Sequence, residues 1–504
     1  SSRGDAASYS LGALVGSKFA DDRGSVVLGF SYNKEQPLQA NQRKFGLNQV
    51  DLFSNPANTG PADGIFDSIA VANYRYPGTS YGGAFVIGGT RYTYDQGGVR
   101  PTRNDATPYG PTGFLGVGGD GFNDADFAPL RNQTEVFAGT AHLEYQASDA
   151  VRVFVDAQYA RTKTVARLQP TFDLGVTITA DNPLIPADVR ALMNAAGQTS
   201  LSIGRTNIDQ GINVRYIDRD TVTGVAGIEG DLGSRFHWMG FYQYGRYQSD
   251  ATRTHNRITD RFNQAVDVIQ GPNGPMCRDA AARAAGCQPL SLFGPNAATP
   301  QALAYFDYTS HRKVVNTQQV AGLQFTSKPF DLPAGPLQLA GGVEYRRETT
   351  DVTPDPLQAA GQLIYLTDAA LSARFSVKEV FGEVLVPILA DRPFAKELSL
   401  EGAVRYSDYS SIGGTTAWKV GGQWAPVRDV RFRVTRSRSV RAPNLSELYN
   451  PGASSNAFIL DPCDSTRVNL TTNRRANCAA LGVAANYTVP FAGVAKTVIT
   501  GGNP

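Results

Sequence analysis

The sequence predicts an all-β fold, part of a large antiparallel transmembrane β-barrel with about twelve of roughly 22 strands and long extracellular loops. Three observations predict it. Apolar and polar residues alternate with period two in segment after segment. The connections between these segments alternate between short and long. No stretch approaches the ~18 to 20 consecutive apolar residues of a transmembrane helix, so a closed barrel is the remaining way to cross a bilayer.

The alternation is clear in the segment 397–409. Leu398, Leu400 and Val404 share one face of an extended chain, and Glu401 and Arg405 lie on the other. A strand between an oily phase and water has this pattern. Twelve such strands are predicted, at about 7–19, 24–38, 133–146, 150–165, 212–232, 236–252, 315–328, 336–351, 374–388, 397–409, 414–425 and 429–441.

Short turns alternate with long loops along the chain, and only the short connection 410–413 departs from this alternation. Bacterial outer-membrane barrels have short periplasmic turns and long extracellular loops, so this sorting favours a barrel over a soluble sandwich. Within the loops we expect short helices at 185–193 and 278–286 and a small hairpin at 84–98. The long loops are predicted at about 39–132, 166–211, 253–314, 352–373 and 442–504.

Charge and composition exclude several classes of function. The 47 basic and 45 acidic residues give a net charge of +2, and no basic patch suggests a nucleic-acid partner. We find no nucleophile paired with a base, so we expect no enzyme. The histidines are scattered without carboxylates at ligand spacing, so neither a metal site nor a cofactor is predicted; they are His142, His237, His255 and His311.

The four cysteines fall into two local pairs, Cys277 with Cys287 and Cys463 with Cys478. Each pair lies in a predicted long loop, and neither has the CxxC spacing of a zinc site. We interpret them as two structural disulfides in an oxidising compartment. Free thiols and a metal site remain the alternatives.

The strand at 429–441 runs into the phrase Arg441-Ala-Pro-Asn-Leu-Ser-Glu-Leu-Tyr449. This phrase resembles a signature of the TonB-dependent outer-membrane receptors, and the segments 12–24, 182–190 and 377–387 are similar to the same family, in its large-loop, sphingomonad-like type. The strand count places the motif at the extracellular rim. Its residues are Arg441, Ala442, Pro443, Asn444, Glu447 and Leu448.

The resemblance implies active uptake of a scarce nutrient (siderophore-iron, cobalamin or a glycan) across the outer membrane of a Gram-negative bacterium. It also implies energy coupling by the TonB–ExbB–ExbD complex through a plug domain. The family's plug, TonB box and aromatic C-terminal strand have no counterpart here, so we expect residues 1–504 to be a partial receptor barrel lacking the plug and the C-terminal barrel strands. A passive porin or adhesin-type barrel is the alternative.

Some residues are candidates for contact with a small nutrient ligand, the lipid bilayer or lipopolysaccharide. Tyr92 and Tyr94 lie in a polar loop, and aromatic side chains among polar ones suit sugars and siderophores equally well. Arg438 belongs to a basic group near the outer rim that suits lipopolysaccharide or an anionic ligand, with solvated charge as the alternative; the group is Arg433, Arg436, Arg438 and Arg441.

Overall fold

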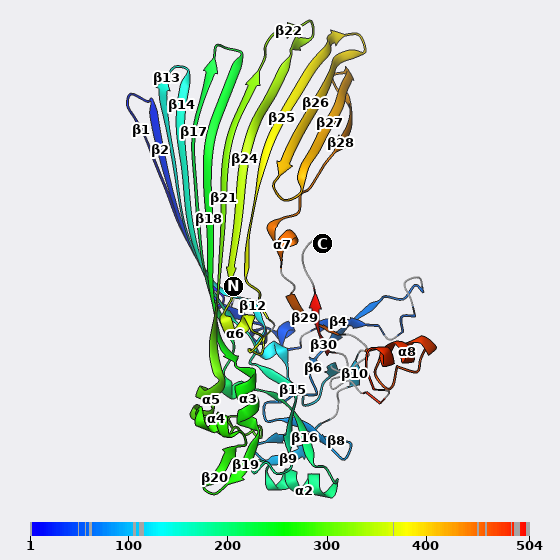
Figure 1. Ribbon diagram of the computed structural model, residues 1–504. Helices are drawn as coiled ribbons and strands as arrows, with labels where there is room; N and C mark the ends of the chain where they lie inside the picture. The colour runs from blue at the N-terminus through cyan, green and yellow to red at the C-terminus, as the bar shows by residue number, and fades with distance from the viewer. Residues whose placement is uncertain are drawn as a thin grey trace.

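Twelve long strands form one antiparallel sheet in the computed structural model, and each strand pairs with its neighbours in chain order (Figure 1). This confirms the all-β prediction and the strand count. The structure describes residues 3–48, 50–55, 57–59, 63–103, 107–109, 115–365, 367–450, 453–458, 461–484, 486–487 and 494–499. The sheet consists of β1 (Ser8–Phe19), β2 (Gly24–Glu35), β13 (Gln133–Ser148), β14 (Val151–Arg167), β17 (Val214–Leu232), β18 (Phe236–Arg257), β21 (Asp307–Ser327), β24 (Gln338–Thr353), β25 (Leu371–Arg392), β26 (Ala395–Tyr409), β27 (Gly413–Val427) and β28 (Val430–Arg438).

The two faces of the sheet differ in the way that the alternation predicts. On the outward face, Leu323, Val343, Val380 and Tyr406 follow one another in register across four strands, and each is about half exposed. On the opposite face, which we call the lumenal face, Glu379 is buried and accepts hydrogen bonds from neighbouring polar side chains. An apolar outward face and a polar lumenal face are typical of a strand set in a bilayer. In the described part of the chain no helix is long and apolar enough to cross a membrane.

Several strands extend beyond their predicted ends, so two predicted loops were too long. The loop predicted at 253–314 covers only 258–306, because β18 runs to Arg257 and β21 begins at Asp307. The loop predicted at 352–373 shortens to 354–370 for the same reason. Strands that rise above a bilayer are wet on both faces, so they lose the alternation by which we detected them. In the opposite sense, β28 ends at Arg438, three residues before its predicted end.

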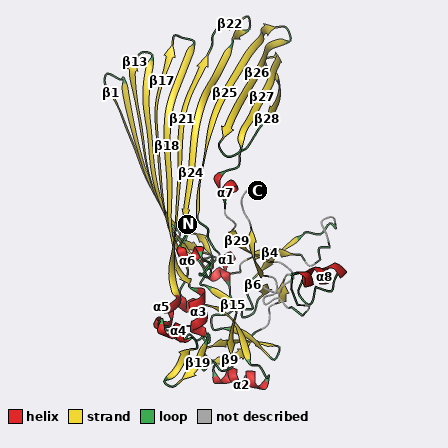
Figure 2. Cartoon of the chain, in the orientation of Figure 1, coloured by secondary structure: helices red, strands yellow, loops and turns green. Residues whose placement is uncertain are grey.

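The long loops gather at the end of the sheet opposite the short turns and build a layer of their own (Figure 2). Two loops that are distant in the chain share a five-stranded sheet in the order β15-β16-β7-β8-β9. The sequence predicted only the hairpin within it. The layer contains β7 (Ala84–Ile87), β8 (Thr90–Asp95), β9 (Gly98–Pro101), β15 (Phe172–Thr179), β16 (Ser200–Thr206), α2 (Ala187–Ala195), α3 (Thr259–Val266), α4 (Ala280–Ala284) and α5 (Pro300–Phe306).

The main hydrophobic core lies in this loop layer. Val189 of α2, Ile203 of β16 and Phe262 of α3 are almost completely buried in one cluster. The helix predicted at 185–193 is α2, and the one predicted at 278–286 is α4, which Gly286 follows with a positive φ of 92°. A left-handed glycine after a helix is a common way to end it. The extracellular loops therefore fold as a packed unit.

The remaining elements are short and mostly lie in the loops. Residues 451–452, 459–460, 485, 488–493 and 500–504 of the predicted loop 442–504 lie outside the described part of the chain. The short elements are β3 (Leu38–Gln39), η1 (Ala40–Gln42), α1 (Lys44–Leu47), β4 (Val50–Ser54), β5 (Ser68–Ala72), β6 (Tyr74–Arg75), β10 (Thr107–Tyr109), β11 (Leu115–Val117), η2 (Asp124–Asp126), β12 (Pro129–Arg131), η3 (Ile208–Gln210), β19 (Val268–Gly271), β20 (Gly274–Cys277), β22 (Asp331–Leu332), β23 (Gly335–Pro336), α6 (Pro356–Ala359), α7 (Leu445–Tyr449), β29 (Ala453–Phe458), α8 (Thr472–Ala480) and β30 (Val494–Ile499).

Candidate functional site: a cationic cavity above the bilayer

The candidate site is a cavity of about 830 Å³ on the lumenal face, formed by β17, β18, β21 and β24 and by the loop that follows β24. Tyr242 and Tyr244 of β18 point outward and are partly exposed, so the alternate residues Ser249 and Arg253 face the lumen. The register places Arg215 of β17 opposite Arg253. Four arginines line the cavity: Arg215, Arg219, Arg253 and Arg312.

The cavity lies above the part of the sheet that a bilayer would cover. Arg253 is 17 residues beyond Phe236, where β18 begins at a short turn. At ~3.3 Å per residue and a tilt of roughly 40°, this places Arg253 about 40 Å above the turn. The apolar band of such barrels is only ~25 Å tall. The site therefore lies in the extracellular vestibule, between the bilayer and the loop layer.

Two acidic residues also line the cavity, and both are already engaged. Asp368 forms an ion pair with Arg312. Asp355 is buried and caps α6 by accepting a hydrogen bond from the backbone N–H of Leu357 at 2.9 Å. It also accepts hydrogen bonds from the Tyr308 hydroxyl and the His311 backbone N–H, each at 3.1 Å. Neither carboxylate neutralises the other three arginines.

The guanidinium of Arg253 is held in place by uncharged groups. Its Nε donates to Asn213 Oδ1 at 2.9 Å, and its Cζ lies 3.6 Å from the centre of the Tyr365 ring. Burial lowers the pKa of Arg253 to about 10; Tyr365 opposes that shift and the positive charge of Arg215 adds to it. The depressed pKa means that the surroundings disfavour the charged guanidinium. Because the pKa of about 10 is still well above 7, the group remains charged at neutral pH. The site can therefore attract an anion.

The motif at 441–449 forms a helix-capping device next to this cavity. Asn444 is the N-cap of α7: its Oδ1 accepts from the Glu447 N–H at 2.9 Å, and Glu447 accepts from the Asn444 N–H at 2.8 Å. Arg441 donates to both Glu447 oxygens at 2.8 and 2.9 Å, which lowers the pKa of that carboxyl. Leu445 is buried, and Ser446 lines the cavity.

Local sequence explains why the chain turns into α7 at this point. Pro443 disfavours a helical conformation at Ala442, so the chain stays extended until Asn444. Leu448 lies in the last turn of α7 and is half-buried. Figure 1 shows α7 directly after the end of β28, on the way to the loop layer. The motif thus lies towards the end of the sheet where the long loops gather, and its place at the extracellular rim remains a prediction.

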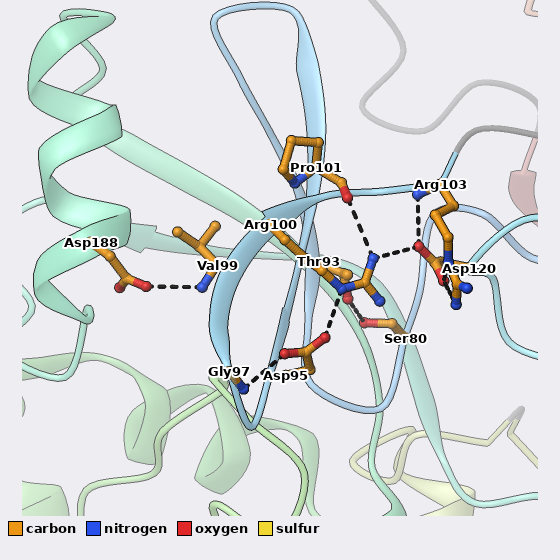
Figure 3. A network of polar contacts seen from close by, with 10 residues as sticks. All are labelled: Ser80, Thr93, Asp95, Gly97, Val99, Arg100, Pro101, Arg103, Asp120 and Asp188. Atoms are coloured by element: carbon orange, nitrogen blue, oxygen red, sulfur yellow. Dashed lines mark hydrogen bonds and ion pairs between the residues drawn. The ribbon is translucent and has the colours of Figure 1, made fainter.

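The hairpin that carries Tyr92 and Tyr94 is held in the loop layer by a polar network (Figure 3). Arg100 donates to Asp95 and to Asp120, each at 2.7 Å, and Arg103 reaches Asp120 at 2.9 Å. Burial raises the pKa of Asp120, but hydrogen bonds from the two arginines outweigh it, so this pKa lies well below its usual range. The network fixes β9 to the neighbouring segment 115–120.

A second polar network joins the loop layer to the upper ends of the strands. Arg257, at the end of β18, is buried and forms an ion pair with Asp173 of β15. Gln210 donates at 2.9 Å to Asp307, where β21 begins. Since one partner of each contact belongs to a strand of the large sheet, the loop layer is anchored to the strands that carry the cavity.

A comparison with known protein families decides what kind of barrel this is. A family profile described as "TonB dependent receptor-like, beta-barrel" matches residues 144–477. The chain belongs to this family. Members of the TonB-dependent receptor family are outer-membrane proteins of Gram-negative bacteria, and the recognition made from the sequence is confirmed. No curated protein matches the chain.

The chain is also similar, at low identity, to several solved structures of ferric and siderophore receptors. A variant of the ferric enterobactin receptor PfeA from Pseudomonas aeruginosa is 12% identical, with 88% of this chain and 42% of that chain covered and a TM-score of 0.41. The siderophore receptor PirA from Acinetobacter baumannii is 13% identical, with 90% and 43% covered and a TM-score of 0.39. The ferric-catecholate import receptor Fiu from E. coli is 10% identical, with 90% and 54% covered and a TM-score of 0.37. The chain thus spans about half the length of these receptors or less.

The structure does not bring the predicted ligand contacts of this receptor together. Tyr92 and Tyr94 pack against the loop core, where Tyr94 meets the Phe293 ring edge-to-face at 5.7 Å. Arg438 is exposed on the outward face at the end of β28, opposite Trp418. Their contact with a ligand remains a prediction. Within the described residues, no group of three or more metal-ligating side chains gathers.

The arginines that line the cavity were not predicted from the sequence. Arg253 lay in a predicted loop, although Arg215 and Arg219 lay on the polar face of a predicted strand and could have signalled a basic lumen. The cysteines form disulfides within the two local pairs that the sequence grouped, Cys277–Cys287 and Cys463–Cys478. These bridges lie in the loops, away from the residues that line the cavity.

Proposed function

We propose that this chain is the barrel part of a receptor that takes up a scarce nutrient across the outer membrane with energy supplied through TonB. The family match over residues 144–477 carries the proposal. The lumenal cavity supports it, because its volume of about 830 Å³ suits a small ligand and its place in the vestibule suits capture from outside the cell. We expect a siderophore-iron complex, cobalamin or a glycan as the nutrient.

The proposed partners follow from the same family match. We infer that the TonB–ExbB–ExbD complex drives transport through a plug domain. We also infer contact with lipopolysaccharide, because Arg374 and Lys378 are exposed on the outward face of β25, towards its extracellular end. No described carboxylate forms an ion pair with either side chain. Exposed cations at this level suit the phosphates of an anionic outer leaflet.

Uptake measured in the native host tests the proposal. We expect deletion of the intact gene to abolish growth on one limiting nutrient among iron, cobalamin and a glycan, and we expect deletion of tonB to have the same effect. A passive porin or adhesin-type barrel is the alternative, and it would leave uptake unchanged in the tonB strain. We propose a receptor without catalytic activity, which a hydrolase screen on the intact protein tests.

A further inference from the structure

The register of the twelve-stranded sheet places Arg215 directly opposite Arg253. Among its described strands this is the one position where two cations face each other in a cross-strand pair. Opposed residues have Cβ atoms ~4.5–5.5 Å apart, and like charges at that spacing destabilise a sheet. Such a pair needs a counter-charge.

At other positions of the same sheet, the cation of a cross-strand pair has a carboxylate opposite it. Lys34 opposes Glu135 and bonds to it at 2.5 Å. Arg152 opposes Glu229 and forms an ion pair with it.

Where acids oppose each other, a cation is near. Arg161 lies 3.5 Å from Asp218, which opposes Asp250. Arg405 lies 3.4 Å from Glu379, which opposes Glu344.

Arg215 and Arg253 depart from this rule. No carboxylate in the described part of the chain forms an ion pair with either residue. Arg219 lies four residues further along the same face of β17 and also forms no ion pair with a described carboxylate; it makes a long hydrogen bond to Thr164 at 3.4 Å. Three of the four cavity guanidinium groups thus have no carboxylate partner among the described residues, because Asp368 is paired with Arg312 and Asp355 caps α6.

We propose that Arg215 and Arg253 bind an oxyanionic group, a carboxylate or phosphate, of the transported ligand. The proposal rests on the proposed function and names its substrate class: a small anion of nutrient size. Asn213 and Tyr365 fix the Nε and the plane of the Arg253 guanidinium, and the terminal nitrogens have no acceptor within the described residues. A guanidinium whose orientation is fixed loses little freedom on binding, and its two terminal donors match the two oxygens of an oxyanion.

The rest of the cavity suits a ligand that is polar beyond its anionic group. Ser249, Asn316 and Thr350 line it with hydroxyl and amide groups, and Tyr247 adds an aromatic ring. A volume of about 830 Å³ lies within the ~300–1,000 Å³ range of small-molecule sites.

A carboxylate of a plug domain is the other source of a counter-charge. The height of the cavity argues against it, because a plug fills the lumen at the level of the bilayer and Arg253 lies about 40 Å above the short turn by the strand geometry. The ligand is therefore the favoured occupant, and the plug becomes an outcome of the test.

The test is a calorimetric titration of the intact, purified receptor with citrate, a tricarboxylate, and with inorganic phosphate; maltotriose serves as an uncharged probe. We expect at least one anion to bind, and the double variant Arg215→Gln/Arg253→Gln to bind it at least about tenfold more weakly, since charge-assisted hydrogen bonds are strong. Lys313→Gln is the matched control: it removes one exposed cation from the outward face of β21, three residues nearer the short turns than the partner of Arg253. It should bind as the wild type does.

Two results would overturn the proposal: the wild type binds neither anion, or the double variant binds as tightly as the wild type. If the first result comes with a lower unfolding temperature of the double variant, the arginines are assigned to the plug. Heat-modifiable migration on gels and outer-membrane abundance verify that each variant folds. Uptake that depends on TonB but not on these arginines would leave the proposed function intact and remove only the site.

Discussion

Phe262→Ala tests whether the extracellular loops fold as a unit with their own core. The Phe262 ring is 1% exposed, meets Phe306 edge-to-face at 5.4 Å, and lies 3.6 Å beneath the Arg257 guanidinium. Truncating a buried phenylalanine costs about 3–5 kcal/mol, and the aromatic and cation–π contacts place this site near the top of that range. We expect the loop layer to lose about 4 kcal/mol of its free energy of unfolding.

Hydrogen exchange followed by mass spectrometry measures this loss segment by segment. A loss of about 4 kcal/mol predicts roughly thousandfold faster exchange in 259–306, because each 1.36 kcal/mol is a factor of ten. The central parts of β24 and β25 should keep their protection. Phe330→Ala removes a phenylalanine that is 52% exposed in a short turn, and it should cost about 0.5 kcal/mol or less.

Two results would refute this reasoning. If exchange in 259–306 is unchanged, the buried cluster does not hold the loops together. If β24 and β25 lose protection to the same extent, the loops and the sheet unfold as one cooperative unit, and the loop layer is not separately stable.

Three further perturbations have defined outcomes. Asn444→Ala removes the N-cap of α7 and should cost about 1 kcal/mol, seen as faster exchange at 445–449, whereas Asn444→Asp should retain protection. The pKa of Asp120 is depressed in the folded state, so its contribution to stability is present above the unfolded pKa of about 3.9 and is lost as the pH falls below it; exchange at 98–103, corrected for intrinsic rates, should accelerate below about pH 4 and stay constant from pH 5 to 8. The Cys277–Cys287 bridge closes a loop with a sequence separation of 10, so Cys277→Ser/Cys287→Ser should cost about 2–3 kcal/mol, and equal proteolysis of variant and wild type in 268–290 would contradict this.

The membrane-level strands could be predicted from the sequence because lipid imposes a pattern on them. Leu323, Val343 and Val380 must be apolar where they meet hydrocarbon, and their polar neighbours must face the lumen, so period two is visible in any one strand. The same physics sorts the turns from the loops. These features are local, and a single sequence is sufficient to detect them.

The loop layer and the cavity could not be predicted in the same way. The pairing of β16 with β7 joins Ile203 to Phe85 across more than a hundred residues, and no local pattern specifies such a partner. The opposition of Arg215 and Arg253 depends on the register of two strands, which a shift of one residue would remove. The motif at 441–449 was visible as a phrase, but its role as an N-cap required the geometry of Asn444 and Glu447.

The residues that were hardest to find are the ones on which we propose that ligand binding depends. Outward side chains at the level of the bilayer must be apolar because they meet lipid, whereas lumenal side chains above the bilayer are in contact with water and, by our proposal, with the ligand. Strands β18 and β21 rise past the apolar band and carry Arg253 and Arg312 into that space, where the Arg257–Asp173 ion pair anchors the loop layer to them. The upper parts of β18 and β21, which lack the alternating pattern, therefore also form the wall of the vestibule. In this receptor we expect changes of ligand to be found as substitutions on the lumenal face of these extensions, with the outward face left unchanged.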